Sequence, residues 1–115
     1  MSDRDALIKI LREDLKAIEV SPGSFSLVAR GEKLPAHVVF ALTTEDHLML
    51  STPLVGTNEI GPIQIFELTQ NLPFGISVMG ENYVLKHLVT MKGMSEEVFR
   101  RELQILLASV ESLQS

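Results

Sequence analysis

Three histidines are the residues best suited to chemistry near neutral pH, because imidazole ordinarily exchanges its proton in that range. They are His37, His47 and His87, and none lies four residues from another, as a helical metal-binding pair would. His37 and His47 fall on neighbouring predicted strands. They could therefore meet across a sheet as a metal-binding or proton-transfer pair beside Glu45 or Asp46, or they could be ordinary histidines at strand ends.

Adjacent carboxylates are the second possible source of acid–base chemistry. They occur as three pairs, at residues 13–14, 45–46 and 96–97. A carboxylate pair acts as acid and base only where burial or a shared pocket separates the two pKa values. The pairs fall on an amphipathic helix, a turn and the first turn of a helix, where water should surround them, so we predict no catalytic carboxylate.

Nucleophile and phosphate-binding motifs are missing from the sequence. The chain has no cysteine, and Ser77 lies inside a predicted strand rather than in a nucleophile elbow. The spacing of Gly56, Gly61, Gly75 and Gly80 fits neither a phosphate loop nor a dinucleotide-binding turn. We therefore expect no catalytic residue, no cofactor and no bound metal.

Composition indicates one domain over residues 1–115. Hydrophobic residues make up 45% of the chain and charged residues 22%, a globular balance. The net charge is −5 and the basic residues are scattered, which argues against nucleic acid and suits basic partners. Without cysteine, a signal-peptide pattern or an apolar run of membrane-spanning length, we expect a cytoplasmic protein that does not insert into membranes.

An amphipathic helix is predicted over residues 2–20, where apolar side chains recur three and four residues apart. They are Leu7, Ile8, Leu11, Leu15 and Ile18. Ser2 should cap the helix together with Asp5, and the sequence Ser21-Pro22-Gly23 should end it.

Three strands should follow and form an antiparallel meander. The alternation of residues 25–29 predicts the first, residues 36–42 the second and residues 47–51 the third. We expect residues 30–33 to form a hairpin loop and Pro35 to weaken pairing at the start of the second strand. Residues 52–62, with two prolines and two glycines, should form an irregular connection.

A short central helix is predicted over residues 63–71, with Pro62 at its first position and residues 71–73 at its end. Ile63, Phe66 and, less clearly, Ile65 should face inward. Residues 74–79 and 83–89 should then form a second hairpin around a turn at residues 80–82.

The final helix carries the strongest regularity. Ser95 should cap it, and Glu96 and Glu97 suit its first turn. Its apolar stripe consists of Phe99, Leu103, Leu106, Val110 and Leu113, widened by Val98, Ile105 and Leu107. Burying such a stripe contributes on the order of 10 kcal/mol before entropy costs, and it could pack on its own sheet or on another chain.

Together these elements predict an α+β fold in the order α-β-β-β-α-β-β-α, with an antiparallel sheet of about five strands. This order resembles the type III secretion chaperone-like fold, as do the segment FELTQNLPFGI at residues 66–76, the residues Tyr83-Val84-Leu85 and the residues Gly93-Met94-Ser95 that open the last helix. It is also similar to the YbjN-type and YjfI-type bacterial domains.

The resemblance implies a small acidic homodimer that binds a protein segment through hydrophobic patches. By position it implies contacts through Ile63, Phe66 and Leu68 of the central helix and Leu85 of the following strand. The final stripe adds four candidate partner contacts, which are Phe99, Leu103, Leu106 and Val110. The leading hypothesis is a non-enzymatic protein-binding, adaptor or chaperone-like domain, and the alternatives are a small-ligand or enzymatic domain using the histidine pair and a regulatory accessory of envelope stress or secretion.

Overall fold

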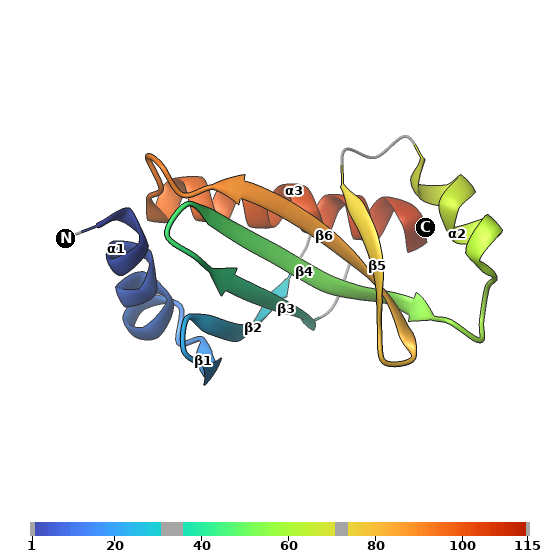
Figure 1. The fold of residues 1–115 in the computed structure, drawn as a ribbon, viewed down its shortest axis with the longest axis horizontal. Helices are drawn as coiled ribbons and strands as arrows, with labels where there is room; N and C mark the ends of the chain where they lie inside the picture. The colour runs from blue at the N-terminus through green and yellow to red at the C-terminus, as the bar shows by residue number, and fades with distance from the viewer. Residues whose placement is uncertain (1, 31–35, 71–73, 115) are drawn as a thin grey trace.

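A computed structural model describes residues 2–30, 36–70 and 74–114 of the chain. The elements appear in Figure 1 in the order α1 (Asp3–Lys9), the π-helical turn η1 (Ile10–Asp14), β1 (Ile18–Ser21), β2 (Ser24–Arg30), β3 (Ala36–Thr43), β4 (His47–Gly56), α2 (Pro62–Thr69), β5 (Gly75–Met79), β6 (Asn82–Thr90) and α3 (Glu96–Gln114). The predicted α+β fold is confirmed.

One antiparallel sheet of six strands forms the framework, in the spatial order β1-β2-β3-β4-β6-β5. The predicted meander is present as β2-β3-β4, and β5 and β6 form the predicted second hairpin. Gly80 opens the two-residue turn of that hairpin with a φ of +61°. Glycine adopts this left-handed conformation readily, and such a turn matches the twist of the flanking strands.

The first helix is shorter than predicted, because its last part forms β1. Ser2 does cap it, accepting a hydrogen bond from the amide of Asp5 at 3.1 Å. The helical path ends at Asp14, and Lys16 then adopts a left-handed φ of 54° that turns the chain away. Ile18, expected to be buried on the helix, lies on the edge strand with 69% of its surface exposed.

The segment Ser21-Pro22-Gly23 is consequently a hairpin turn rather than a helix stop. β1 ends at Ser21 and β2 begins at Ser24, and the two strands pair antiparallel. Gly23, with a φ of +77°, makes this tight reversal possible.

β4 is longer than predicted and runs through part of the segment expected to be irregular. It continues past Ser51 to Gly56, and the register pairs residues 52, 53, 55 and 56 of this extension with β6. Pro53 lacks an amide hydrogen, and the ladder accommodates it at a register shift between Pro53 and Val55. Next to this shift, Thr52 links β4 to β3 by donating its hydroxyl to the carbonyl of Val38 at 2.8 Å.

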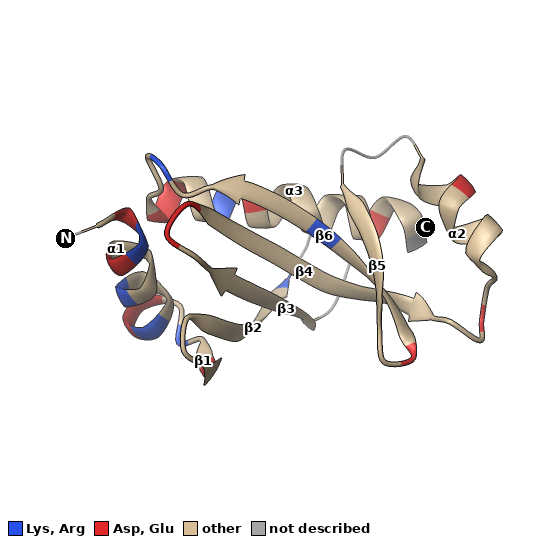
Figure 2. Ribbon diagram, in the orientation of Figure 1, with Lys and Arg blue, Asp and Glu red and all other residues tan. Residues whose placement is uncertain are grey.

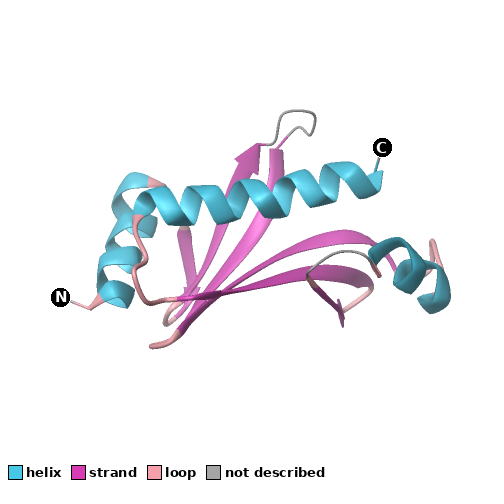
Figure 3. Ribbon diagram, turned by 90° about the horizontal axis from the view of Figure 1, so that it is seen from above, coloured by secondary structure: helices cyan, strands magenta, loops and turns pink. Residues whose placement is uncertain are grey.

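The core lies on one face of the sheet, beneath α3 and α1 (Figure 3). Alternate residues of the strands point into it, as strand geometry requires. The largest fully buried side chains come from α1, η1, α3, the strands and the segment after β6: Leu7, Leu11, Phe25, Val39, Leu48, Leu50, Leu85, Met91, Phe99, Leu106, Leu107 and Val110.

α3 forms as predicted. Ser95 caps it, because its hydroxyl accepts the amide of Val98 at 3.2 Å and its carbonyl accepts the amide of Phe99 at 2.9 Å. Four residues of the stripe pack on the chain's own sheet, which favours the intramolecular alternative for them: Phe99, Leu103, Leu106 and Val110. Ile105 beside them is 42% exposed.

The central helix α2 begins at Pro62 as predicted but faces differently. Ile65 and Thr69 are buried, whereas Ile63 and Phe66, predicted to face inward, are exposed.

The molecule measures 44 × 26 × 25 Å, and α2 lies at one end of the sheet while α1 lies at the other (Figures 1 and 3). The predictions for residues 31–33, for Pro35 and for residues 71–73 lie outside the described residues.

Candidate functional site

The two histidines of the enzymatic alternative lie far apart on the sheet. His37 is the second residue of β3, pairs with Ala29 and has its Nε2 3.1 Å from the carbonyl oxygen of Pro53. His47 begins β4 and pairs with Thr90. β3 and β4 run antiparallel, so His37 near the start of β3 and His47 at the start of β4 lie at opposite ends of the strand pair.

His47 shares an open cleft with charged residues from three segments. The cleft is lined by Ser2, Asp3, Arg4, Glu45, Asp46, His47, Thr90, Met91 and Lys92. Within the described ranges, no cluster of three or more histidine or acidic side chains is arranged to hold a metal ion. The pairing of His37 with His47 beside Glu45 or Asp46, on which the enzymatic alternative rested, is therefore not formed.

His87 makes a contact that the sequence did not reveal. Its Nε2 lies 2.6 Å from Oε2 of Glu102, and both side chains are more than four-fifths covered. The ring of Phe74 packs edge-on against the imidazole, with 4.6 Å between the ring centroids. The contact links β6 to α3. His87 and Glu102 lie 15 positions apart in the sequence, so no local sequence pattern indicates that they meet.

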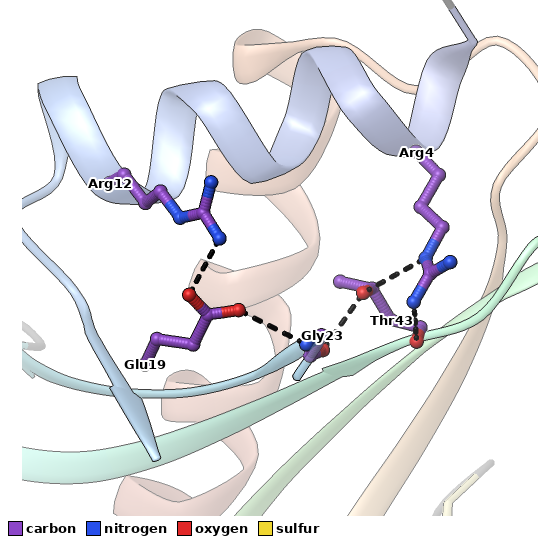
Figure 4. A network of polar contacts seen from close by, with 5 residues as sticks. All are labelled: Arg4, Arg12, Glu19, Gly23 and Thr43. Atoms are coloured by element: carbon purple, nitrogen blue, oxygen red, sulfur yellow. Dashed lines mark hydrogen bonds and ion pairs between the residues drawn. The ribbon is translucent and has the colours of Figure 1, made fainter. Parts of the chain in front are cut away.

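A polar network fastens the first helix to the sheet (Figure 4). Arg4 donates to the hydroxyl and the carbonyl oxygens of Thr43 at 3.3 and 3.4 Å, and that hydroxyl donates to the carbonyl of Gly23 at 2.8 Å. Glu19 accepts from Arg12 at 2.6 Å and from the amide of Gly23 at 3.2 Å. The hydrogen bond from Arg12, followed by that from the Gly23 amide, lowers the pKa of the Glu19 carboxyl below its ordinary value.

Five of the eight predicted partner contacts are core residues. Leu85, Phe99, Leu103, Leu106 and Val110 are all buried within the chain itself. In this conformation they are closed to a second chain, because the sheet and α3 cover each other. The apolar stripe of α3 predicted burial correctly, but the sequence could not tell which surface would cover it.

The other three predicted contacts lie on α2 and are open to solvent. Ile63, Phe66 and Leu68 are 75%, 68% and 54% exposed. Beside them runs an apolar groove of about 420 Å³, lined by Leu54, Val55, Glu59, Ile60, Ile65, Leu68 and Leu113. We call the three side chains and this groove the α2 surface, where an apolar ridge and an apolar groove lie side by side.

One side of the sheet faces away from α3 (Figure 1), and it carries a second group of exposed apolar side chains that was not predicted from the sequence. The strand register aligns its side chains in rows: Leu42 pairs with Met49, which pairs with Leu88. A neighbouring row runs from Ile18 of β1 through Ser26, Phe40 and Ser51 to Lys86 of β6. We call this surface the open sheet face. Its exposed large apolar residues are Ile18, Val28, Val38, Leu42 and Leu88.

The charge of the sheet is opposite to that of the chain. The five strands β2 to β6 contain no aspartate or glutamate, and their only formally charged side chains are Arg30 and Lys86. Figure 2 shows the acidic residues on helices, on turns and on the edge strand β1. An apolar, weakly basic surface is thus flanked by helices and turns that carry the acidic residues together with most of the basic ones.

Comparison with protein-family models, with curated proteins and with solved structures finds no match in any of the three. Among the described residues, no helix is both long and apolar enough to cross a membrane. What the chain does must therefore be argued from its own surfaces.

Proposed function

We propose that this chain is a non-enzymatic protein-binding domain of adaptor or chaperone-like type that acts as a small acidic homodimer in the cytoplasm. The observation that carries the proposal is the α2 surface. An eight-residue helix exposes Ile63 and Phe66 to water and buries mainly Ile65. Leaving two large apolar side chains exposed on one short helix forgoes burial worth about 1.5–3 kcal/mol for each of them.

The geometry of the α2 surface suits association of two copies about a twofold axis. In such an interface the same patch serves both partners, so each patch must offer both a projection and a recess. Phe66 supplies the projection, and the groove beside Leu68 supplies the recess. Among the described residues that line the groove, Glu59 is the only charged one, so self-association would bury little unpaired charge.

The positions of the three histidines are also consistent with a protein-binding role rather than an enzymatic one. His37 and His47 are at opposite ends of a strand pair, and His87 is held by Glu102 inside the fold. The type III secretion chaperone-like resemblance points to the same class of function, and it stays a proposal that rests on the residues quoted above.

Light scattering coupled to size-exclusion chromatography tests the homodimer over a concentration series. We expect a dimer for the unmodified chain and a monomer for Ile63→Ser at the same concentration. Val28→Ser is the matched control, because it removes an exposed β-branched side chain, 65% exposed, from the open sheet face. A strict monomer at high concentration, or dissociation by the Val28 variant alone, would contradict the assignment of the dimer to α2.

A further inference from the structure

The open sheet face offers a second binding surface, distinct from the α2 surface. Five strands contribute to it, which at about 4.8 Å between neighbours gives a width of roughly 20 Å. Val28, Val38, Leu42 and Leu88 stand on it at exposures between 41% and 65%. Exposed apolar clusters of this extent on a sheet mark interaction surfaces in soluble proteins.

A hollow in this face has Lys86 among its lining residues. It measures about 320 Å³ and is lined by Met49, Gly75, Lys86, His87 and Leu88. Register places Lys86 between Ser51 of β4 and Gly75 of β5. In the part of the chain that the structure describes, no carboxylate lies within ion-pair distance of Lys86. An occupant of this face would need to supply the negative charge itself.

The opposite face of the sheet shows which kind of occupant satisfies these requirements. There, α3 lays an apolar stripe across the strands and places the carboxylate of Glu102 on His87, 2.6 Å away. Lys86 precedes His87 on the same strand, and because side chains alternate along a strand it points to the open face. Along β3, Phe40 and Leu42 likewise point to the open sheet face, whereas the alternating residues Val39 and Ala41 are buried on the α3 side.

Charge argues against a second copy of the sheet as the occupant. Packing two open faces together would bring two Lys86 side chains into one dry interface, and strands β2 to β6 carry no carboxylate to pair with them. Burying unpaired charge in this way is strongly unfavourable. A partner with apolar residues and flanking carboxylates meets no such penalty.

We propose that the open sheet face binds an amphipathic helix of a partner protein, whose apolar stripe packs on Leu42, Met49 and Leu88 and whose flanking carboxylate pairs with Lys86. The inference rests on the proposed protein-binding function and deepens it by naming the chemistry of the partner. In the bound state the sheet lies between two helices, α3 on one face and the partner helix on the other.

Two designed peptides serve as probes in place of the natural partner. Each has about 18 residues with a leucine stripe, and the flanks are glutamate in one and lysine in the other. The full-length chain, labelled with nitrogen-15, is titrated with each peptide and the amide resonances are followed. We expect the glutamate peptide to shift residues of β3, β4 and β6 saturably and the lysine peptide to bind more weakly.

Reversing the charge at residue 86 distinguishes specific pairing with a carboxylate from nonspecific hydrophobic association. Lys86→Glu should weaken the glutamate peptide by roughly five-fold and strengthen the lysine peptide by a similar factor, since exposed ion pairs contribute on this scale. Lys92→Glu is the matched control, because it changes the net charge equally from an exposed turn beyond β6. It should leave both affinities within about two-fold.

Four results would overturn the inference. Resonance shifts confined to Ile63, Phe66 and the α2 groove would show that the peptide binds the α2 surface instead, and the proposed protein-binding function would still hold. The absence of saturable shifts with either peptide would remove the sheet site, whereas the light-scattering test of the homodimer would stand independently. Equal responses of the Lys86 and Lys92 variants would exclude pairing at Lys86. Protection of the open sheet face on dimerisation alone would show that a second copy occupies it.

Discussion

Replacing Phe99 and Phe66 by alanine compares the same change in two environments. The Phe99 side chain is fully buried between α3 and the sheet, and truncating a buried phenylalanine costs about 3–5 kcal/mol. The surface of Phe66 is 68% exposed, so about one third is covered. One third of a phenylalanine that buries 150–250 Å² gives at most about 1–2 kcal/mol, and less because the unfolded chain already hides some surface.

The assay is urea unfolding followed by circular dichroism, at a concentration where light scattering reports a monomer. A domain of this size is stable by about 5–15 kcal/mol, so Phe99→Ala should remove a large part of that stability. With an m-value of about 1–3 kcal/mol per molar urea, we expect its midpoint to fall by roughly 2 M. Phe66→Ala should shift the midpoint by less than half as much, while weakening self-association at higher concentration.

The comparison fails if Phe99→Ala loses under about 1 kcal/mol in the monomer. That result would mean that the α3 stripe is not the core of the isolated chain and that another chain covers it. It would also fail if Phe66→Ala destabilised the monomer as strongly as Phe99→Ala, because α2 would then be packed rather than exposed. A variant too unstable to purify can be replaced by Phe99→Leu, which should cost about half as much.

Three further predictions concern local contacts. Glu102→Ala should cost about 1–3 kcal/mol in urea unfolding, because His87 would stay buried without its partner. Glu19 has a lowered pKa, so its stabilising contribution is present above the ordinary glutamate pKa and is lost as pH falls below about 4. Glu19→Gln should therefore flatten the pH dependence of the unfolding midpoint in that range, and an unchanged profile would contradict the role given to its hydrogen bonds. Lys16→Gly should stabilise the chain by up to about 1 kcal/mol because Lys16 has a left-handed φ of 54°, whereas Lys9→Gly in α1 should destabilise it by a similar amount.

Local patterns in the sequence were sufficient for α3 and for most strands. Ser95 followed by two glutamates and an apolar stripe predicts a capped helix that buries Phe99 and Leu106, and this is what forms. Strand runs such as residues 36–42 are likewise fixed by side-chain type and alternation. These features depend on residues a few positions apart, so they can be predicted from the sequence without knowledge of the tertiary structure.

The errors arose where a local pattern fitted two structures. Ile18 continues the helical spacing of Leu11 and Leu15, yet it also belongs to a strand that pairs with β2. Pro53 reads as a strand breaker, although a register shift lets β4 continue past it. In both places the long-range pairing of strands outweighed a local preference of the order of 1 kcal/mol.

The sequence by itself determined the α+β class, the capped amphipathic α3 and the lack of acidic residues across β2 to β6. Only the tertiary structure decided which surfaces stayed open. The antiparallel direction of β3 and β4 separated His37 from His47, and the register aligned Leu42 with Leu88 across β4. Register and helix placement depend on contacts among distant residues, so a partner surface built from several strands can be identified only after the chain has folded.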